Sequence, residues 1–171
     1  METFDAIRSR RNVRAFADRG IDPADLDRIL EAARRSPSAR NRQRWDFVVS
    51  TDRSRLEALA GVWQGAWHVA GAPAVIALIA PVAESADENA SIEYDLGQVT
   101  MSIMLAAADL GIGTAHASVA DQDLARTLLG FPEGHRCAYL LSIGYPGDRP
   151  LKPIQNPDRR PFDEVVHRET W

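Results

Sequence analysis

Arginines are the residues in this sequence best suited to binding chemistry. Arg10, Arg11 and Arg14 lie within five residues, where a short helix is expected to end. A guanidinium holds a phosphate or carboxylate through two parallel hydrogen bonds and keeps its charge. Closely spaced like charges repel, so a bound anion would stabilise them, although a solvated helix end has the same composition. Because Arg159 and Arg160 form a second pair near the other end, both segments are candidate anion sites.

Two further segments could contact a flat ligand. Residues 37–45 contain the amides Asn41 and Gln43, which can donate and accept hydrogen bonds at the edge of a heteroaromatic ring. An ordinary polar loop has a similar composition. Gly111 and Gly113 follow a long apolar stretch, where they would let backbone amides approach a ligand or would simply end a helix. Taken alone, neither segment decides between these alternatives.

Composition excludes several function classes. The 171 residues carry 20 Lys and Arg against 24 Asp and Glu, a net charge of -4, whereas a nucleic-acid-binding domain is usually strongly basic. The longest apolar run, 72–83, contains Pro73 and Pro81 and is shorter than the ~20 residues of a membrane-spanning helix. One cysteine and four scattered histidines provide neither a disulfide nor a zinc-binding spacing. The first residues lack the apolar stretch of a signal peptide, so we expect a cytoplasmic protein without a metal site.

Helices and strands alternate along the chain and must position these residues. The expected helices cover 3–10 with Thr3 as cap, the residues from Pro23 to before Pro37 with Asp22 as cap, 53–60, 91–110, 122–129 with Asp121 as cap, and a short terminal segment. The expected strands cover 46–50, 74–80, 114–118 and 138–144. This order predicts an α/β or α+β class, in a single domain over 1–171 whose residues 151–171 form an extended tail. Helix 91–110 is apolar on several sides, which is typical of a central helix or one shared with a partner.

In their order and spacing, these segments resemble the FMN-dependent nitroreductase family over essentially the whole chain. The similarity rests on Arg10-Arg11-x-x-Arg14-x-Phe16, Pro37-Ser38-Ala39-Arg40-Asn41-x-Gln43-x-Trp45-x-Phe47, Asp95-x-Gly97, Leu105-Ala106-Ala107, Leu110-Gly111-Ile112-Gly113-Thr114, Ile143-Gly144-Tyr145-Pro146 and Arg159-Arg160-Pro161. The resemblance implies an α+β fold, a three-layer α-β-α sandwich with a mainly antiparallel sheet. It also implies an intertwined homodimer, with one FMN in each of two sites built from both subunits and helix 91–110 at the interface.

The resemblance assigns the site residues to two ends of the cofactor. The phosphate and ribityl end would be held by Arg10, Arg11, Asn12, Arg14, Arg159 and Arg160. The isoalloxazine would be contacted by Pro37, Ser38, Ala39 and Asn41 of the other subunit, with Gln43 nearby and Gly113 and Thr114 close to the cofactor. No catalytic side chain is implied, because the flavin carries the chemistry.

The implied activity is hydride transfer from NAD(P)H through FMN to a nitroaromatic, a quinone or a similar electrophile, in a ping-pong scheme. The alternative is a flavin-binding or deazaflavin-linked protein of the same fold with little nitroreductase turnover. A purely structural role would leave two arginine clusters without an anion.

The sequence departs from the family pattern at several positions. The chain is shorter between Ala80 and Ile92, so a more open site is expected. Arg44 stands where the family usually has proline and could change what binds beside the flavin. Met101 and Ser102 replace a common glutamine and asparagine, so no flavin contact is assigned to that helix. His116, where many relatives have an aromatic residue, is interpreted as a buried structural histidine, with an acid or substrate-orienting role as the alternative.

Overall fold

A four-stranded antiparallel sheet separates two layers of helices in the computed structural model, which describes residues 1–171. The strand order is β1-β2-β4-β3, with β1 at Asp46–Ser50, β2 at Ala74–Pro81, β3 at Gly113–Ser118 and β4 at His135–Gly144. The central strand β2 is apolar throughout and β4 is buried along most of its length, because helices cover both of their faces. Every pairing between these strands is antiparallel, which confirms the predicted α+β sandwich.

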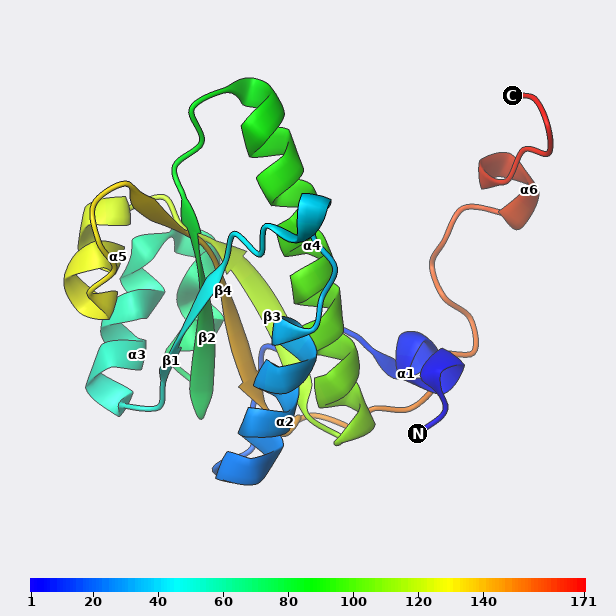
Figure 1. Cartoon of the computed structure of the whole chain (residues 1–171). Coiled ribbons are helices and arrows are strands. Elements are labelled where there is room, and N and C mark those ends of the chain that lie inside the picture. The colour runs from blue at the N-terminus through cyan, green and yellow to red at the C-terminus, as the bar shows by residue number, and fades with distance from the viewer.

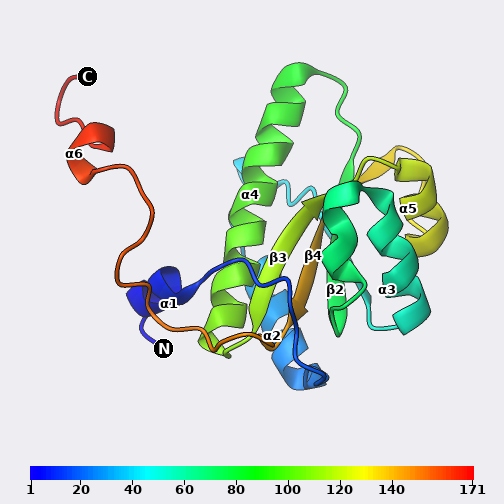
Figure 2. The ribbon, with the colours of Figure 1, turned by 180° about the vertical axis from the view of Figure 1, so that it is seen from behind.

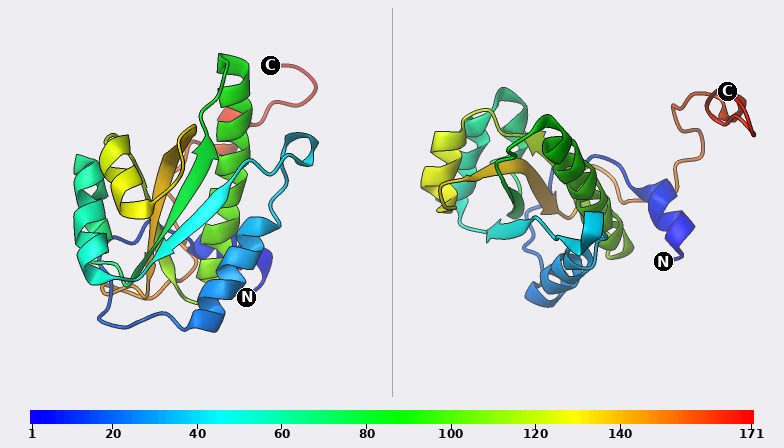
Figure 3. Two further views of the ribbon diagram at one scale, coloured as in Figure 1. Left: turned by 60° about the vertical axis from the view of Figure 1, so that its left-hand side comes forward. Right: turned by 45° about the horizontal axis from the view of Figure 1, so that its top comes forward.

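The helices divide between the two faces of the sheet, as Figure 3 shows. One layer contains α2 (Pro23–Arg34) and α4 (Ala86–Asp109). The other contains α3 (Arg53–Leu59), α5 (Gln122–Leu129) and the 3-10 segments η2 (Ala60–Val62) and η3 (Gln64–Val69). Three short elements lie outside these layers, namely α1 (Thr3–Ser9), η1 (Ala39–Asn41) and α6 (Phe162–Val165). None of the helices combines the length and apolarity needed to cross a membrane.

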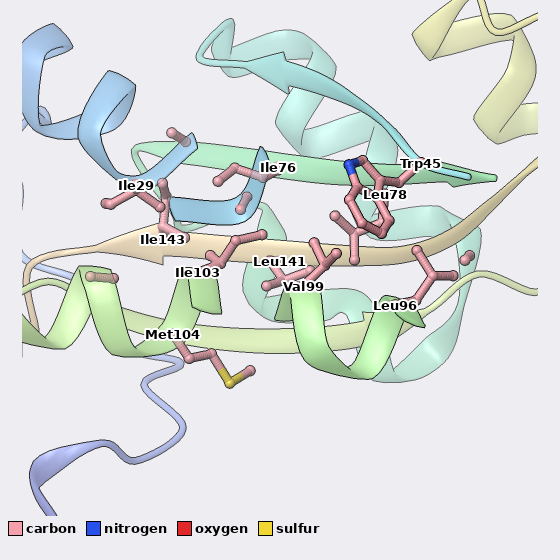
Figure 4. Close-up of a cluster of buried hydrophobic side chains, with 14 of the residues drawn as sticks. Ile29, Trp45, Ile76, Leu78, Leu96, Val99, Ile103, Met104, Leu141 and Ile143 are labelled. Atoms are coloured by element: carbon pink, nitrogen blue, oxygen red, sulfur yellow. The ribbon is translucent and has the colours of Figure 1, made fainter. Parts of the chain in front are cut away.

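Alternating residues of the strands build two cores, because successive side chains of a strand point to opposite faces. Ile76 and Leu78 of β2 pack with Ile103 of α4 in the larger core, which Figure 4 shows between the sheet, α2 and α4. Their neighbours Val75 and Ala77 belong to the second core, under α3, η3 and α5. The sheet therefore holds both helical layers at fixed positions.

Side-chain caps mark the starts of α2, α3, α4 and α5. Asp22 accepts a hydrogen bond from Ala24 N and Asp121 accepts one from Leu124 N, which confirms both predicted caps. The prediction for Thr3 was wrong, since it is the first residue of α1 and Glu2 precedes it without a capping bond. Helix α4 begins at Ala86, not at residue 91, because Ser85 accepts from Glu88 N at 3.2 Å. The Glu88 carboxylate in turn accepts from Glu84 N at 2.9 Å, so the two side chains cap the helix together.

Residues 10–17 dock along the outer strand β3 and the end of β4, after crossing from α1 as Figure 2 shows. Val13 N donates to Thr114 O at 2.9 Å, and Val13 is buried. A Cβ added at Gly113 would lie 2.4 Å from Val13 Cγ2. Gly113 is therefore required for close packing of the N-terminal segment.

The last part of the chain leaves the body of the molecule and ends in α6 (Figure 1). Ile154 N donates to Arg8 O at 3.0 Å, which ties the beginning of this tail to α1. Helix α1 and the start of the tail thus lie side by side.

We expect Gly113→Ala to destabilise the protein by about 1–3 kcal/mol, because the added methyl group overpacks against Val13. Urea unfolding at a fixed protein concentration measures the change. Gly20→Ala is the control, since nothing lies within 4 Å of its added Cβ. Equal stability of the two variants would contradict the packing role of Gly113.

Candidate functional site

The extended backbone of residues 10–14 sends alternate side chains in opposite directions. Arg10 and Asn12 line one pocket, whereas Val13 is buried against Gly113 and Arg11 reaches Asp148. Arg10 and Arg14 thus line pockets, whereas Arg11, which lies between them in the sequence, has a partner elsewhere.

Arg11 already has an anionic partner within the chain. Its Nη2 atom donates to Asp148 Oδ1 and to Arg149 O, both at 2.7 Å. The hydrogen bond from Arg11 lowers the pKa of the Asp148 carboxyl to about 2. The Arg11 charge is therefore balanced by a carboxylate, which argues against its predicted role in holding a cofactor phosphate.

Three pockets follow residues 10–14 across the molecule. The tail pocket, about 470 Å³, lies between α1, α4 and the tail and is lined by Phe4, Ile7, Arg8, Arg10, Met101, Ile154, Gln155, Pro157 and Arg159. The helix pocket, about 410 Å³, is lined by Arg10, Asn12, Glu93, Gly97, Thr100, Met101, Met104, His116 and Tyr139. The edge pocket, about 430 Å³, is lined by Arg14, Trp63, Gly65, Trp67, His116, Ala117 and Ser118. Arg10 and Met101 line the first two pockets and His116 lines the last two, so the three pockets are neighbours in a row, and this row of pockets is called the channel below.

The tail pocket brings together arginines from opposite ends of the chain, namely Arg8, Arg10 and Arg159, and of these Arg8 lies 4.0 Å from the carboxylate of Asp5. The Arg10 guanidinium contacts only Met104 Sδ, at 3.9 Å, and Arg159 donates only to the carbonyl of its neighbour Asp158. Neither guanidinium is paired with a carboxylate. Arg160 differs, because its Nε lies 3.5 Å from Glu164 Oε2, and it lines none of the three pockets.

The helix pocket has a polar wall that the sequence did not suggest. Tyr139 Oη donates to Glu93 Oε2 at 2.8 Å, and Arg136 Nη2 lies 2.5 Å from Glu93 Oε1. Burial, together with the hydrogen bond to Glu93, raises the pKa of Tyr139. Tyr139 therefore stays protonated at neutral pH and can donate to Glu93.

The buried structural histidine is His68 and not His116. His116 is exposed at the junction of the helix and edge pockets, because β3 is the outermost strand. Its ring lies edge-on to Tyr139, with the ring centroids 6.5 Å apart. His68 Nδ1 lies 2.7 Å from Ser142 Oγ, and burial lowers the pKa of His68.

The loop over residues 37–45 has an unusual backbone that helix α4 holds in place. Arg40, Asn41 and Gln43 adopt left-handed φ angles of 54°, 55° and 49°. Such angles are unfavourable for residues other than glycine and need surrounding support. Ser38 Oγ accepts from Gln43 N at 3.0 Å, and the Asp95 carboxylate accepts from Ala39 N at 3.1 Å.

Arg44 adds ion pairs and a hydrogen bond to these supports. Its side chain is only 11% exposed, and its Nη2 atom donates to Ser91 Oγ at 2.7 Å. Its Nη1 atom lies 3.2 Å from Glu88 Oε1, and Nη2 lies 3.8 Å from Asp95 Oδ2. Arg44 therefore ties the loop to α4, and it lines none of the three pockets of the channel.

The predicted site residues fall into two separate groups within one chain. Arg10, Asn12, Arg14 and Arg159 line the channel. The remainder line none of its three pockets, namely Arg11, Pro37, Ser38, Ala39, Asn41, Gln43, Gly113, Thr114 and Arg160. Gly113 and Thr114 are covered by the docked N-terminal segment, whereas the loop side chains are mostly exposed beside the first half of α4.

Comparison with known proteins identifies relatives of this chain along its whole length. The model of the nitroreductase family matches residues 7–80 and 58–145. A protein of Archaeoglobus fulgidus, provisionally named NADH dehydrogenase/NAD(P)H nitroreductase, is 33% identical over 99% of both chains. The FMN reductase [NAD(P)H] of Bacillus subtilis is 25% identical, over 99% of this chain and 74% of its own length. Among solved structures, an FMN-dependent nitroreductase from Clostridium difficile R20291 is similar with a TM-score of 0.85 and 23% identity, covering 98% of this chain and 99% of its own.

We expect Arg44→Ala to destabilise the protein by about 2–4 kcal/mol, because it leaves the buried Asp95 carboxylate without its cation. Urea unfolding of Arg42→Ala provides the control, since Arg42 is exposed and forms no ion pair. The double variant Arg44→Ala/Asp95→Asn should recover part of the loss, because the unpaired charge is gone. Similar stability of the Arg44 and Arg42 variants would show that the loop does not depend on this contact.

Proposed function

The chain belongs to the nitroreductase family, and on this premise we propose that it is an FMN-dependent oxidoreductase that transfers electrons from NAD(P)H to an electrophilic aromatic acceptor. The names of its relatives support this proposal, since they include an FMN reductase [NAD(P)H] and an oxygen-insensitive NADPH nitroreductase. With a quinone, NAD(P)H and one proton would yield NAD(P)⁺ and the hydroquinone.

The observation that carries the proposal is the pairing of Arg10 and Arg159 in the tail pocket without a carboxylate. Two guanidinium groups in one pocket repel each other unless an anion lies between them. A phosphate monoester fits this requirement, because arginine binds phosphate through charge-assisted hydrogen bonds. The tail pocket therefore suits the phosphate end of FMN.

The rest of the channel suits the remaining parts of FMN. In the helix pocket, Asn12, Glu93 and Thr100 offer the polar groups that would hold the ribityl hydroxyls. In the edge pocket, Arg14 lies beside His116 and two tryptophans, which suits a flat conjugated ring. The residues present thus fit the cofactor along the whole channel.

Bound FMN would supply the centre that accepts hydride from the nicotinamide and passes the electrons to the acceptor. The chain would contribute binding and electrostatics. Arg14 gives the edge pocket a fixed positive charge, which would stabilise the negative charge that a ring bound there gains on reduction. We propose that NAD(P)H and the acceptor bind beside the flavin ring in turn, which makes the scheme ping-pong.

The proposed assembly is a homodimer with residues of both subunits in each site. Two observations support it. The loop residues assigned to the isoalloxazine lie apart from the channel of their own chain, as expected if they complete the partner's site. Phe4, Ile7, Met101 and Ile154 expose apolar side chains together around the tail pocket, and such a patch is typical of a protein interface.

Two further parts of the proposal concern the chain as a whole. We propose that residues 1–171 act as one FMN-binding domain, in which the tail over 151–171 contributes Arg159. The partners would be small molecules and not nucleic acid, in line with the net charge of -4. A cytoplasmic location suits the use of NAD(P)H.

The visible absorption spectrum tests the function. Purified protein loaded with FMN should bleach on anaerobic addition of NADPH or NADH, and the bands should return when 1,4-naphthoquinone is added. A bound flavin that neither nucleotide bleaches would favour a flavin-binding protein. Failure to bind FMN would contradict the proposal and favour the deazaflavin alternative.

We expect Arg10→Ala and Arg159→Ala each to weaken FMN binding by about 1.5–3 kcal/mol, or roughly 10- to 150-fold in Kd, because each removes a charge-assisted contact. Fluorescence titration of the apoprotein with FMN measures this change. Arg160→Ala is the matched control in the tail, because Glu164 already pairs with that guanidinium. An unchanged Kd in both the Arg10 and the Arg159 variant would remove the phosphate assignment.

A further inference from the structure

His116 stands where the helix pocket and the edge pocket meet, and the proposed function gives it no role of its own. Successive side chains of a strand point to opposite faces, so His116 is exposed although its neighbours Ala115 and Ala117 are buried. The N-terminal segment pairs with β3 at Thr114 and leaves His116, two residues further along, uncovered. With FMN in the channel, His116 would lie where the ribityl chain meets the ring.

The titratable groups around His116 come from the N-terminal segment, α4, β4 and η3, namely Arg10, Arg14, Glu93, Arg136, Tyr139 and His68. The arginines keep their charge at every pH of interest. Both oxygens of Glu93 are occupied, one by Tyr139 Oη and the other by Arg136 Nη2. Burial raises the pKa of Tyr139 and lowers the pKa of His68, so both rings stay uncharged at neutral pH. The surroundings of His116 therefore hold little capacity to take up a proton.

The His116 ring itself is under no such constraint. A ring nitrogen of His68 is held 2.7 Å from Ser142 Oγ. The ring of His116 only packs edge-on against Tyr139, and neither of its nitrogens has a hydrogen-bond partner within the chain. Imidazole is the only side chain whose ordinary titration falls between pH 5 and pH 8. His116 is thus the group of the channel best able to gain or lose a proton during a reaction.

Reduction of a bound flavin ring would change the charge that His116 meets. A hydride carries two electrons and one proton, so its transfer from NAD(P)H leaves one additional negative charge at the ring. Arg14 disfavours a second positive charge in the edge pocket while the ring is uncharged, whereas the negative charge that reduction adds favours the imidazolium. Reduction should therefore draw a proton to His116.

We propose that His116 takes up a proton from solvent when the bound ring is reduced, and gives up that proton when the electrons pass to the acceptor. The inference rests on the proposed function and assigns the channel a proton carrier that touches the cofactor. With a quinone the balance is complete, because the transferred hydride and this proton together convert the quinone to the hydroquinone. His116 then returns to its starting charge.

NMR of the FMN-loaded enzyme with ¹⁵N-labelled histidines tests the proton uptake directly. The His116 signal is identified by its absence in His116→Phe, and it is followed against pH in the oxidised enzyme and after anaerobic reduction with dithionite. The His116 ring should bind its proton about tenfold more tightly in the reduced enzyme, because a nearby negative charge favours the imidazolium. His167 is the internal control, since it packs against Trp171 in the tail and should titrate identically in both states.

Redox titration against a reference dye gives a second measurement, because a charged His116 stabilises the reduced state. Below the pH range in which His116 titrates, His116→Phe should shift the equilibrium about tenfold toward oxidised flavin. This difference should disappear as the pH rises through the titration of His116 in the reduced enzyme. His116→Arg carries a fixed charge, so it should keep the stabilisation at alkaline pH, where the wild type has lost it. His167→Phe is the matched control and should behave as the wild type does.

Failure of the inference and failure of the proposed function give different results. If the wild type binds no FMN, or if NADPH cannot reduce the bound flavin, the proposed function and the role of His116 both fall. If NADPH reduces the flavin but His116 titrates at the same pH in both states, the role of His116 is overturned and the function stands. A redox equilibrium that His116→Phe leaves unchanged at every pH would overturn that role equally.

Discussion

The candidate site depends on the docking of residues 10–14 as extended chain along β3. Val13 fits over Gly113, where a Cβ would collide with it, and its amide donates to Thr114 O. This contact fixes which side chains face outward, because extended chain alternates its two sides. Arg10, Asn12 and Arg14 therefore face the channel, while Arg11 turns away to Asp148.

The remaining walls of the channel come from elements that packing elsewhere in the molecule holds in place, above all α4. Helix α4 packs one face in the larger core and leaves Gly97, Thr100 and Met101 for the helix pocket. The same helix binds the loop over 37–45 through Asp95 and the residues around Arg44. One long helix thus positions both groups of predicted site residues, although they lie apart within a single chain.

Local signals in the sequence predicted much of this fold. Asp22 and Asp121 cap their helices as expected, because caps act within a few residues. The cap formed by Ser85 and Glu88 was equally local and was missed, so the start of α4 was placed too late. Three features depend on tertiary neighbours that sequence periodicity does not reveal. The docking on β3 separates the arginine side chains, and the place of β3 at the edge of the sheet leaves His116 exposed. Gly65 and His68 position Trp63 and Trp67.

The central claim is that Arg10 and Arg159 hold the phosphate of a bound FMN, and the ³¹P NMR spectrum of the loaded protein tests it most directly. A free phosphate monoester takes up its second proton with a pKa of about 6. Two guanidinium groups favour the dianion, so we predict that the bound resonance stays constant between about pH 8 and pH 5. A resonance that titrates across this range as free FMN does would contradict the account.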